Sequence, residues 1–297
     1  MFSSIINADL FAAMLRVATP LLLVAIGAAF TLKAGIFNVA VEGLMLVAAF
    51  LAVVLSTLLG NLWLGILLTI VLTTLVALLY GFVTISMKAD HIIAGLGINL
   101  FSAGMTAWLL QSVLNSPGGF SSTNTPDIPV VHVAFLDHIP ALGTIFNGQN
   151  VITLTSWLLI VVSYLFVHRS KFGLRLRATG EHPVAATTVG ISPVQWQYIS
   201  IIMCGVFCAL GGTALSMGSI NLFTKGMTAG RGFISFAAAS FAGGSIPGTV
   251  IISFTFALFS SLAIRLGGLG IPTRFVQMIP YLVTLIALIF SRRRNRL

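Results

Sequence analysis

Residues 171–193, KFGLRLRATGEHPVAATTVGISP, are the only long charged interruption inside a chain that is otherwise almost wholly apolar. The stretch begins with basic residues and continues into a run of small residues at 185–188, which is long enough for one or two helical turns. It is too polar to cross a bilayer and too short to form a domain of its own. We therefore expect a short polar helix between membrane spans.

The composition of the whole chain is that of an integral membrane protein. Its 297 residues are 58% hydrophobic and 7% charged, and the mean hydropathy is +1.07, whereas soluble domains contain roughly 25% charged residues. The net charge of +9 lies in loops and at the C-terminal tail, which is the distribution of cytoplasmic loops. A nucleic acid polymer is therefore not expected as a partner.

The apolar runs predict an all-α polytopic membrane protein with about nine transmembrane helices (range eight to ten), because one span needs about 20 apolar residues. The seventh run, GFISFAAASFAGGSI, is short and rich in small residues, which favours a broken or re-entrant helix. Residues 1–297 are expected to form a single transmembrane domain. The predicted spans are 11–32, 36–58, 62–86, 92–113, 150–168, 194–217, 232–246, 248–266 and 275–291.

Lysine and arginine predict the orientation. The tail SRRRNRL and the run HRSKFGLRLR are strongly basic, which places both in the cytoplasm. Counting spans from them puts the C-terminus inside, the N-terminus outside and the loop 114–149 outside the cell. This loop contains several prolines and glycines and no long helical period, so we expect an ordered surface lid or an irregular loop. The basic residues predicted inside are Lys33, Lys88, Arg169, Lys171, Arg175, Arg177, Arg292, Arg293, Arg294 and Arg296.

Polar residues inside predicted spans are candidates for a translocation pathway. Glu42 is the only acidic residue within a span, and an intramembrane carboxylate usually faces a cavity or a partner. The alternative is a carboxylate bonded to neighbouring backbone or to Lys33. Asn38 lies four residues earlier, which would put it on the same helix face. Asn99 lies among glycines and either bonds to another helix or contacts substrate.

The other motifs of the sequence give no indication of catalysis by this chain. Cys204 and Cys208 are four residues apart in an apolar run without a histidine or carboxylate beside them, so we expect packing residues and no metal site. The loop GMTAGRGF, 226–233, lacks the ending of a nucleotide-binding loop. We expect it to begin a helix whose positive end faces a cavity. No H-E-x-x-H or G-x-S-x-G pattern occurs, and no catalytic residue is predicted.

The polar stretch itself predicts a helix over EHPVAATTVG. Glu181 favours its N-terminus, Pro183 suits the first turn, and Gly190 ends it. One interpretation is a connector that lies on lipid headgroups. The other is a helix that inserts into a groove on a soluble protein. The small residues at 185–188 favour the second, because a helix on lipid needs large apolar side chains on one face.

Five motifs resemble those of one family. GIFNVAVEGLMLVAA, IIAGLGINL, FGLRLRATGEHPVAATTVGI, GMTAGRGFISFAAASFAGGSIPG and MIPYLVTLIAL resemble permease subunits of bacterial ABC importers, in the branched-chain amino acid and ribose permease superfamily. The chain is most similar to the permeases for simple sugars and nucleosides, from about Pro20 to the basic tail. A weak internal echo, AGIFNVAVEGLMLVAAFLA and AGRGFISFAAASFAGG, agrees with an internal pseudo-repeat.

The resemblance implies a type II importer fold and several partners. These are a second permease subunit, a cytoplasmic ABC ATPase and an extracytoplasmic substrate-binding lipoprotein or periplasmic protein. The segment 169–193 would be the cytoplasmic coupling loop, with His182 where the family commonly has asparagine. The family has no defined high-affinity site in the permease, so Asn38, Glu42 and Asn99 are nominated for the pathway. The coupling residues that match the family are Gly180, Glu181, Pro183, Ala185, Ala186 and Gly190.

The function that the resemblance implies is ATP-driven uptake of nucleosides, purine nucleosides above all, across the bacterial cytoplasmic (inner) membrane. ATP and Mg²⁺ would bind to the partner ATPase, and no cofactor is expected in this chain. Uptake of a simple sugar is a close alternative, because ribose is part of a nucleoside. A carrier that moves protons through Glu42 and a membrane scaffold without transport are alternatives from other classes.

Overall fold

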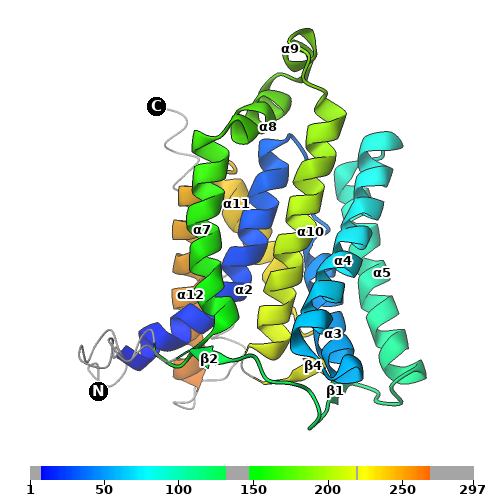
Figure 1. The fold of residues 1–297 in the computed structure, drawn as a ribbon, viewed down its shortest axis with the longest axis vertical. Helices are drawn as coiled ribbons and strands as arrows, with labels where there is room; N and C mark the ends of the chain where they lie inside the picture. The colour runs from blue at the N-terminus through cyan, green and yellow to red at the C-terminus, as the bar shows by residue number, and fades with distance from the viewer. Residues whose placement is uncertain (1–7, 132–146, 219, 268–297) are drawn as a thin grey trace.

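The computed structural model describes residues 8–131, 147–218 and 220–267, which form a bundle of helices with a few short strands (Figure 1). The predicted span 275–291 and the basic tail lie outside these residues. The helices are α2 (Ala8–Lys33), α3 (Val41–Leu59), α4 (Leu62–Gly81), the π-helical turn η1 (Phe82–Ser86), α5 (His91–Ser112), α7 (Val151–Arg169), α8 (Lys171–Glu181), α9 (Pro183–Thr188), α10 (Pro193–Met217), α11 (Arg231–Phe241) and α12 (Ile246–Gly267). The strands are β1 (Gly119–Ser121), β2 (Val130–Val131), β3 (Gln149–Asn150) and β4 (Leu222–Thr224).

Seven helices among the described residues are long and apolar enough to cross a membrane: α2, α3, α4 with η1, α5, α7, α10 and α12. The mostly helical fold is therefore confirmed, whereas the exact count of about nine spans is not. Helix α11, in the predicted span 232–246, has only 11 residues. It is about 17 Å long at 1.5 Å per residue, roughly half of the hydrocarbon thickness.

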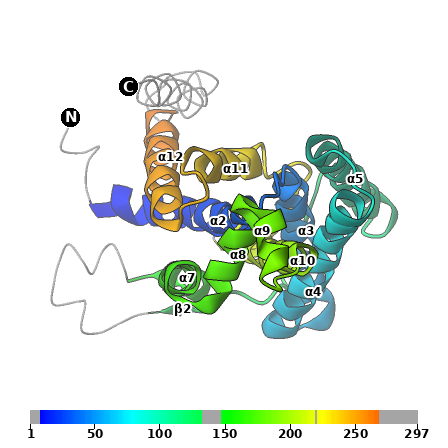
Figure 2. The same ribbon diagram turned by 90° about the horizontal axis from the view of Figure 1, so that it is seen from above.

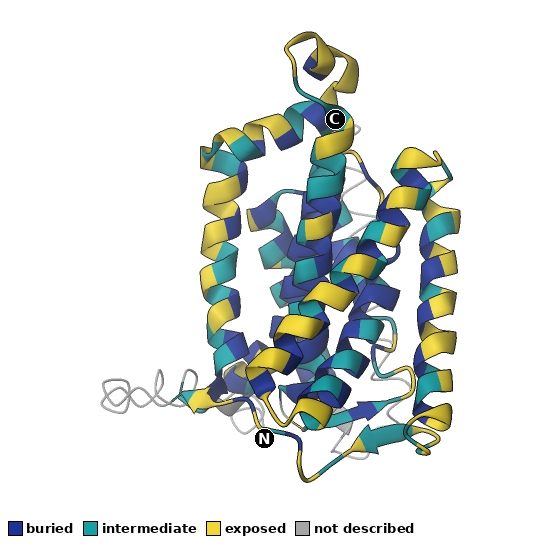
Figure 3. Ribbon diagram, turned by 45° about the vertical axis from the view of Figure 1, so that its right-hand side comes forward, coloured by how far each residue is buried: buried dark blue, intermediate teal, exposed yellow. Residues whose placement is uncertain are grey.

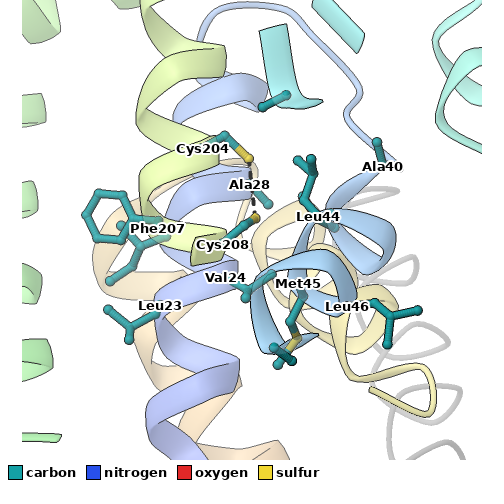
Figure 4. Packing of buried hydrophobic residues seen from close by; sticks show 14 of the residues in the cluster. Leu23, Val24, Ala28, Ala40, Leu44, Met45, Leu46, Cys204, Phe207 and Cys208 are labelled. Atoms are coloured by element: carbon teal, nitrogen blue, oxygen red, sulfur yellow. Dashed lines mark hydrogen bonds between the residues drawn. The ribbon is translucent and has the colours of Figure 1, made fainter. Parts of the chain in front are cut away.

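The core lies where α2, α3 and α10 meet, the region that is darkest in the burial view (Figure 3). Side chains from the three helices interdigitate there, among them Leu44 and Phe207 (Figure 4). A methyl group added at Gly212 would lie 2.5 Å from the carbonyl oxygen of Met45, so only glycine permits this approach of α10 to α3. Close packing of backbones thus replaces the hydrophobic effect, which is weak between helices in lipid.

The two cysteines belong to this core. Both are fully buried and free, and their sulfur atoms are 3.9 Å apart on one face of α10 (Figure 4). The prediction that Cys204 and Cys208 are packing residues on one helix face is confirmed.

Helices α4, α5 and α7 form the periphery. Viewed along the bundle, α7 stands on one side and α4 and α5 on another (Figure 2). Their outward faces consist of large apolar side chains such as Trp63, Leu100 and Leu158. In a membrane protein these faces contact lipid or another hydrophobic subunit.

The two ends of the bundle differ in structure. One end has α8 and α9, and the strands lie at the opposite end (Figure 1). There β1 pairs with β4 and β2 with β3, both antiparallel. The described parts of the loop 114–149 contain β1, β2, β3 and turns, in agreement with an irregular loop.

The connection between α2 and α3 is not helical. Helix α3 begins at Val41 rather than at residue 36, because residues 34–40 form turns and extended chain. Gly35 has φ of +80°, a left-handed conformation that favours glycine and reverses the chain after α2. We call residues 34–40 the α2–α3 link. Asn38 lies in this link, so the prediction that Asn38 and Glu42 share a helix face is wrong.

Candidate functional site

Residues 171–190, which contain α8 and α9 and which we call the arm, project from one end of the bundle (Figure 1). Ser170 caps α8, since its hydroxyl accepts a hydrogen bond from the backbone N–H of Gly173 at 3.2 Å. Pro183 occupies the first turn of α9, and Gly190, with φ of +79°, follows its end. Glu181 is the last residue of α8, so the prediction that it begins the second helix is wrong.

The predicted coupling residues fall into two groups. Glu181, Pro183, Ala185 and Gly190 are exposed on the arm and are free to contact another protein. Ala186 is 3% exposed and packs within the arm. Gly180 is half-buried, and its backbone packs against the α2–α3 link. Contact of all six residues with an ATPase stays a prediction.

Two residues that the sequence analysis overlooked complete the arm. Val184 of α9 and Val189, directly after α9, are 79% and 71% exposed. Helix α9 is the part of the arm farthest from the bundle (Figure 1). Apolar side chains on an exposed helix are typical of a segment that docks in a hydrophobic groove. The available signal was that these two valines flank the small residues 185–188 in an otherwise polar stretch.

An aromatic cluster fixes the base of the arm. Phe172 of α8 contacts Trp196 of α10 edge to face, with ring centroids 5.0 Å apart, and Phe166 of α7 at 4.5 Å. The guanidinium of Arg175 lies 5.8 Å from the centre of the Trp196 ring, within the range of a cation–π interaction. The base of α8 is thus joined to two membrane helices, and its motion is tied to theirs.

Glu42 joins the beginnings of two helices inside the bundle. It lies in the first turn of α3, and its carboxylate accepts hydrogen bonds from three backbone N–H groups at the start of α11. The distances are 2.9 Å to Gly230, 2.7 Å to Gly232 and 3.3 Å to Phe233. These N–H groups have no partner within the helix, and a negative charge at a helix N-terminus is favourable. The positive end of α11 thus meets the carboxylate of Glu42, and the expectation that it also faces a cavity stays a prediction.

Asn99 of α5 binds the backbone on both sides of the start of α3. Its side-chain oxygen accepts from the N–H of Gly43 at 2.7 Å, and its amide donates to the carbonyl of Val39 at 3.0 Å. Asn38 is fully buried, where its amide donates to the sulfur of Cys204 at 3.4 Å. The three pathway candidates thus form one polar junction around the start of α3. Their hydrogen bonds support backbone and packing, and contact with a substrate stays a prediction.

The arrangement is that of a transport protein. Helix α11 has only 11 residues, too few to cross the hydrocarbon core, and its start meets the start of α3 in a polar junction, a pattern known from transporters with discontinuous helices. No group of three or more His, Cys, Asp or Glu suited to a metal occurs in the described part of the chain. The fold and this junction define a multi-pass membrane permease.

The chain belongs to the family described as branched-chain amino acid transport system, permease component, whose model matches residues 10–288. It is 35% identical to the nucleoside ABC transporter permease protein NupC of Lactococcus lactis, over 93% of this chain and 89% of NupC. It is 31% identical to the guanosine ABC transporter permease protein NupQ of Bacillus subtilis, over 91% of this chain and 88% of NupQ. The chain is thus a transport subunit and not itself an enzyme.

The fold is shared with a solved structure. PsaBC from Streptococcus pneumoniae in complex with Fab matches with a TM-score of 0.51 and 17% identity, over 95% of this chain and 89% of that one. Membership of the ABC permease family implies association with an ATPase and a substrate-binding protein.

Proposed function

We propose that this chain is the transmembrane subunit of an ATP-driven importer for nucleosides, with purine nucleosides preferred. The observation that carries the importer assignment is the arm, which presents Val184 and Val189 to a partner outside the bundle. Two relatives that match about nine-tenths of the chain are named for nucleoside or guanosine transport, which supports the substrate class. ATP and Mg²⁺ then bind to the partner ATPase, and this chain needs no cofactor.

The arm end is proposed to face the cytoplasm. Six basic residues lie on segments at this end of the bundle, namely Lys33, Lys88, Arg169, Lys171, Arg175 and Arg177. Such a concentration is typical of the cytoplasmic side. The start of α2 and the strands lie at the opposite end (Figure 1), which puts the start of α2 outside the cell. The strand-bearing end then receives substrate from the substrate-binding protein.

A second permease subunit is proposed to pack beside this chain in the membrane. Asn38, Glu42 and Asn99 are nominated for the pathway of this chain because they form the polar junction around the start of α3. Residues 1–297 act as one membrane domain in this proposal, with 169–193 as the coupling loop and 114–149 outside.

Uptake of a simple sugar is the second candidate. The putative glucose ABC transporter permease protein TsgC13 of Haloferax volcanii is 31% identical over 87% of this chain and 78% of TsgC13. A proton-coupled carrier has less support, because the carboxylate of Glu42 is held by backbone N–H groups of α11.

The test is uptake into proteoliposomes that contain this chain with its partner permease, ATPase and substrate-binding protein. Radiolabelled guanosine and adenosine should accumulate only with ATP, and ribose and glucose should not compete. Equal uptake of glucose would favour the sugar importer. Uptake that persists without the ATPase and follows a pH gradient would refute the importer.

A further inference from the structure

The arm touches the α2–α3 link through two glycines. A methyl group added at Gly180 would lie 2.2 Å from the carbonyl oxygen of Lys33 and 2.9 Å from the backbone nitrogen of Gly35. One added at Gly35 would lie 3.3 Å from the Cα of Gly180. The neighbours are backbone atoms, which cannot move aside as the end of a flexible side chain does. The last turn of α8 and the link therefore move together.

The same stretch of chain holds α11 at three points. Glu42 binds the N–H groups at its start. Phe37 of the link contacts Phe236 in its middle, edge to face, with centroids 4.6 Å apart. Past its end, a methyl group at Gly244 would lie 3.3 Å from the carbonyl oxygen of Ala29 and from the Cβ of Leu32. One segment, 29–42, thus contacts α11 at its start, in its middle and past its end.

We infer that the α2–α3 link transmits the movement of the arm to α11. Gly180, which packs against the start of the link, and Phe37, which joins the link to α11, are the positioning residues. This inference rests on the proposed function, in which a partner ATPase moves the arm. Packed backbones and short contacts transmit displacement because closely packed elements have few intermediate arrangements. Helix α11, only 11 residues long and in contact with the link through Phe37, is then the membrane-domain helix that moves with the arm.

Hydrogen exchange of the assembled transporter in nanodiscs tests this inference, with mass spectrometry of peptides covering 181–190 and 226–241. The nucleotide-free complex is compared with the complex trapped by ATP, Mg²⁺ and vanadate. Both peptides should change between the two states. In Gly180→Ala the change at 181–190 should persist, whereas the change at 226–241 should fall at least fivefold. Gly97→Ala is the matched control, because Gly97 is exposed on α5 with no atom within 4 Å of an added methyl group.

A second variant covers the outcome in which Gly180→Ala fails to assemble. Phe37→Ala removes the ring contact to α11 without adding an atom, and Phe37 is already 42% exposed. It should also weaken the change at 226–241 at least threefold while the change at 181–190 remains. Phe101→Ala, at an exposed position of α5, should leave both changes intact.

The inference is overturned if 226–241 responds to nucleotide in Gly180→Ala or Phe37→Ala as it does in the unsubstituted chain. It is also overturned if that peptide never responds. None of these hydrogen-exchange measurements requires a substrate. A complex that shows the expected exchange pattern but carries no nucleoside would therefore refute the proposed substrate and leave the transmission intact.

Discussion

Glu42→Gln should loosen the start of α11 without unfolding the bundle. The carboxylate has one oxygen for Gly230 and the other for Gly232 and Phe233. Glutamine has a single acceptor oxygen, and its NH₂ group would face a backbone N–H, where two donors oppose each other. Glutamine therefore leaves at least one of these N–H groups without a partner and removes the charge from the helix N-terminus.

The size of the effect follows from these two losses. A buried N–H without an acceptor costs about 1–3 kcal/mol, and a lost charge at a helix N-terminus costs about 0.3–2 kcal/mol. Taking about 1.4 kcal/mol from each, the opening equilibrium of this helix start rises about 100-fold. The exchange rates of the Gly230, Gly232 and Phe233 amides should rise by that factor.

The assay is hydrogen exchange of the purified chain in nanodiscs, with fragmentation that resolves single amides. Glu181→Gln is the matched control, because Glu181 is an exposed carboxylate at the end of α8. It should leave the three rates unchanged. Rates within threefold of the unsubstituted protein in Glu42→Gln would show that the carboxylate does not hold α11.

Three further predictions concern the docking surface, the helix packing and the buried thiols. Val184→Asp should lower recovery of the ATPase with this chain in pull-down at least tenfold, whereas membrane insertion stays normal; unchanged recovery would remove Val184 from the docking surface. Gly212→Leu should abolish the folded, monodisperse protein in size-exclusion chromatography because Met45 and Ala48 leave no space beside it, whereas Gly97→Leu should be tolerated. The buried thiols of the folded chain, Cys204 and Cys208, should not react with maleimide within an hour, and both should react after denaturation in SDS.

The membrane helices could be predicted from the sequence because their signal is local. A long apolar run needs no partner to identify it, and six of the predicted spans correspond to helices within a few residues at their ends. The start of α3 was misplaced by five residues, since the apolar run continues through the α2–α3 link. Hydropathy measures how apolar a segment is, whereas the break depends on the left-handed backbone at Gly35.

The polar junction could be predicted only in part. Glu42 and Asn99 stood out because polar residues are costly inside a span. Their partners did not, because Glu42 and Gly230 are 188 positions apart and nothing local links them.

The break between α8 and α9 could have been predicted from the sequence. His182 precedes Pro183, and a residue before proline avoids the helical conformation; its φ of −144° and ψ of 78° show this.

The exposed tip of the arm should make this chain sensitive to proteolysis when its partner subunits are absent. Helix α9 has six residues and only Ala186 buried, so few contacts protect it from local opening. Short exposed segments of this kind are where proteases cut first. When the chain is produced in excess over its partners, we therefore expect the arm to be a site where proteolysis begins among the described residues. Cellular levels of the transporter would then be set by assembly, because unassembled copies are removed from this end.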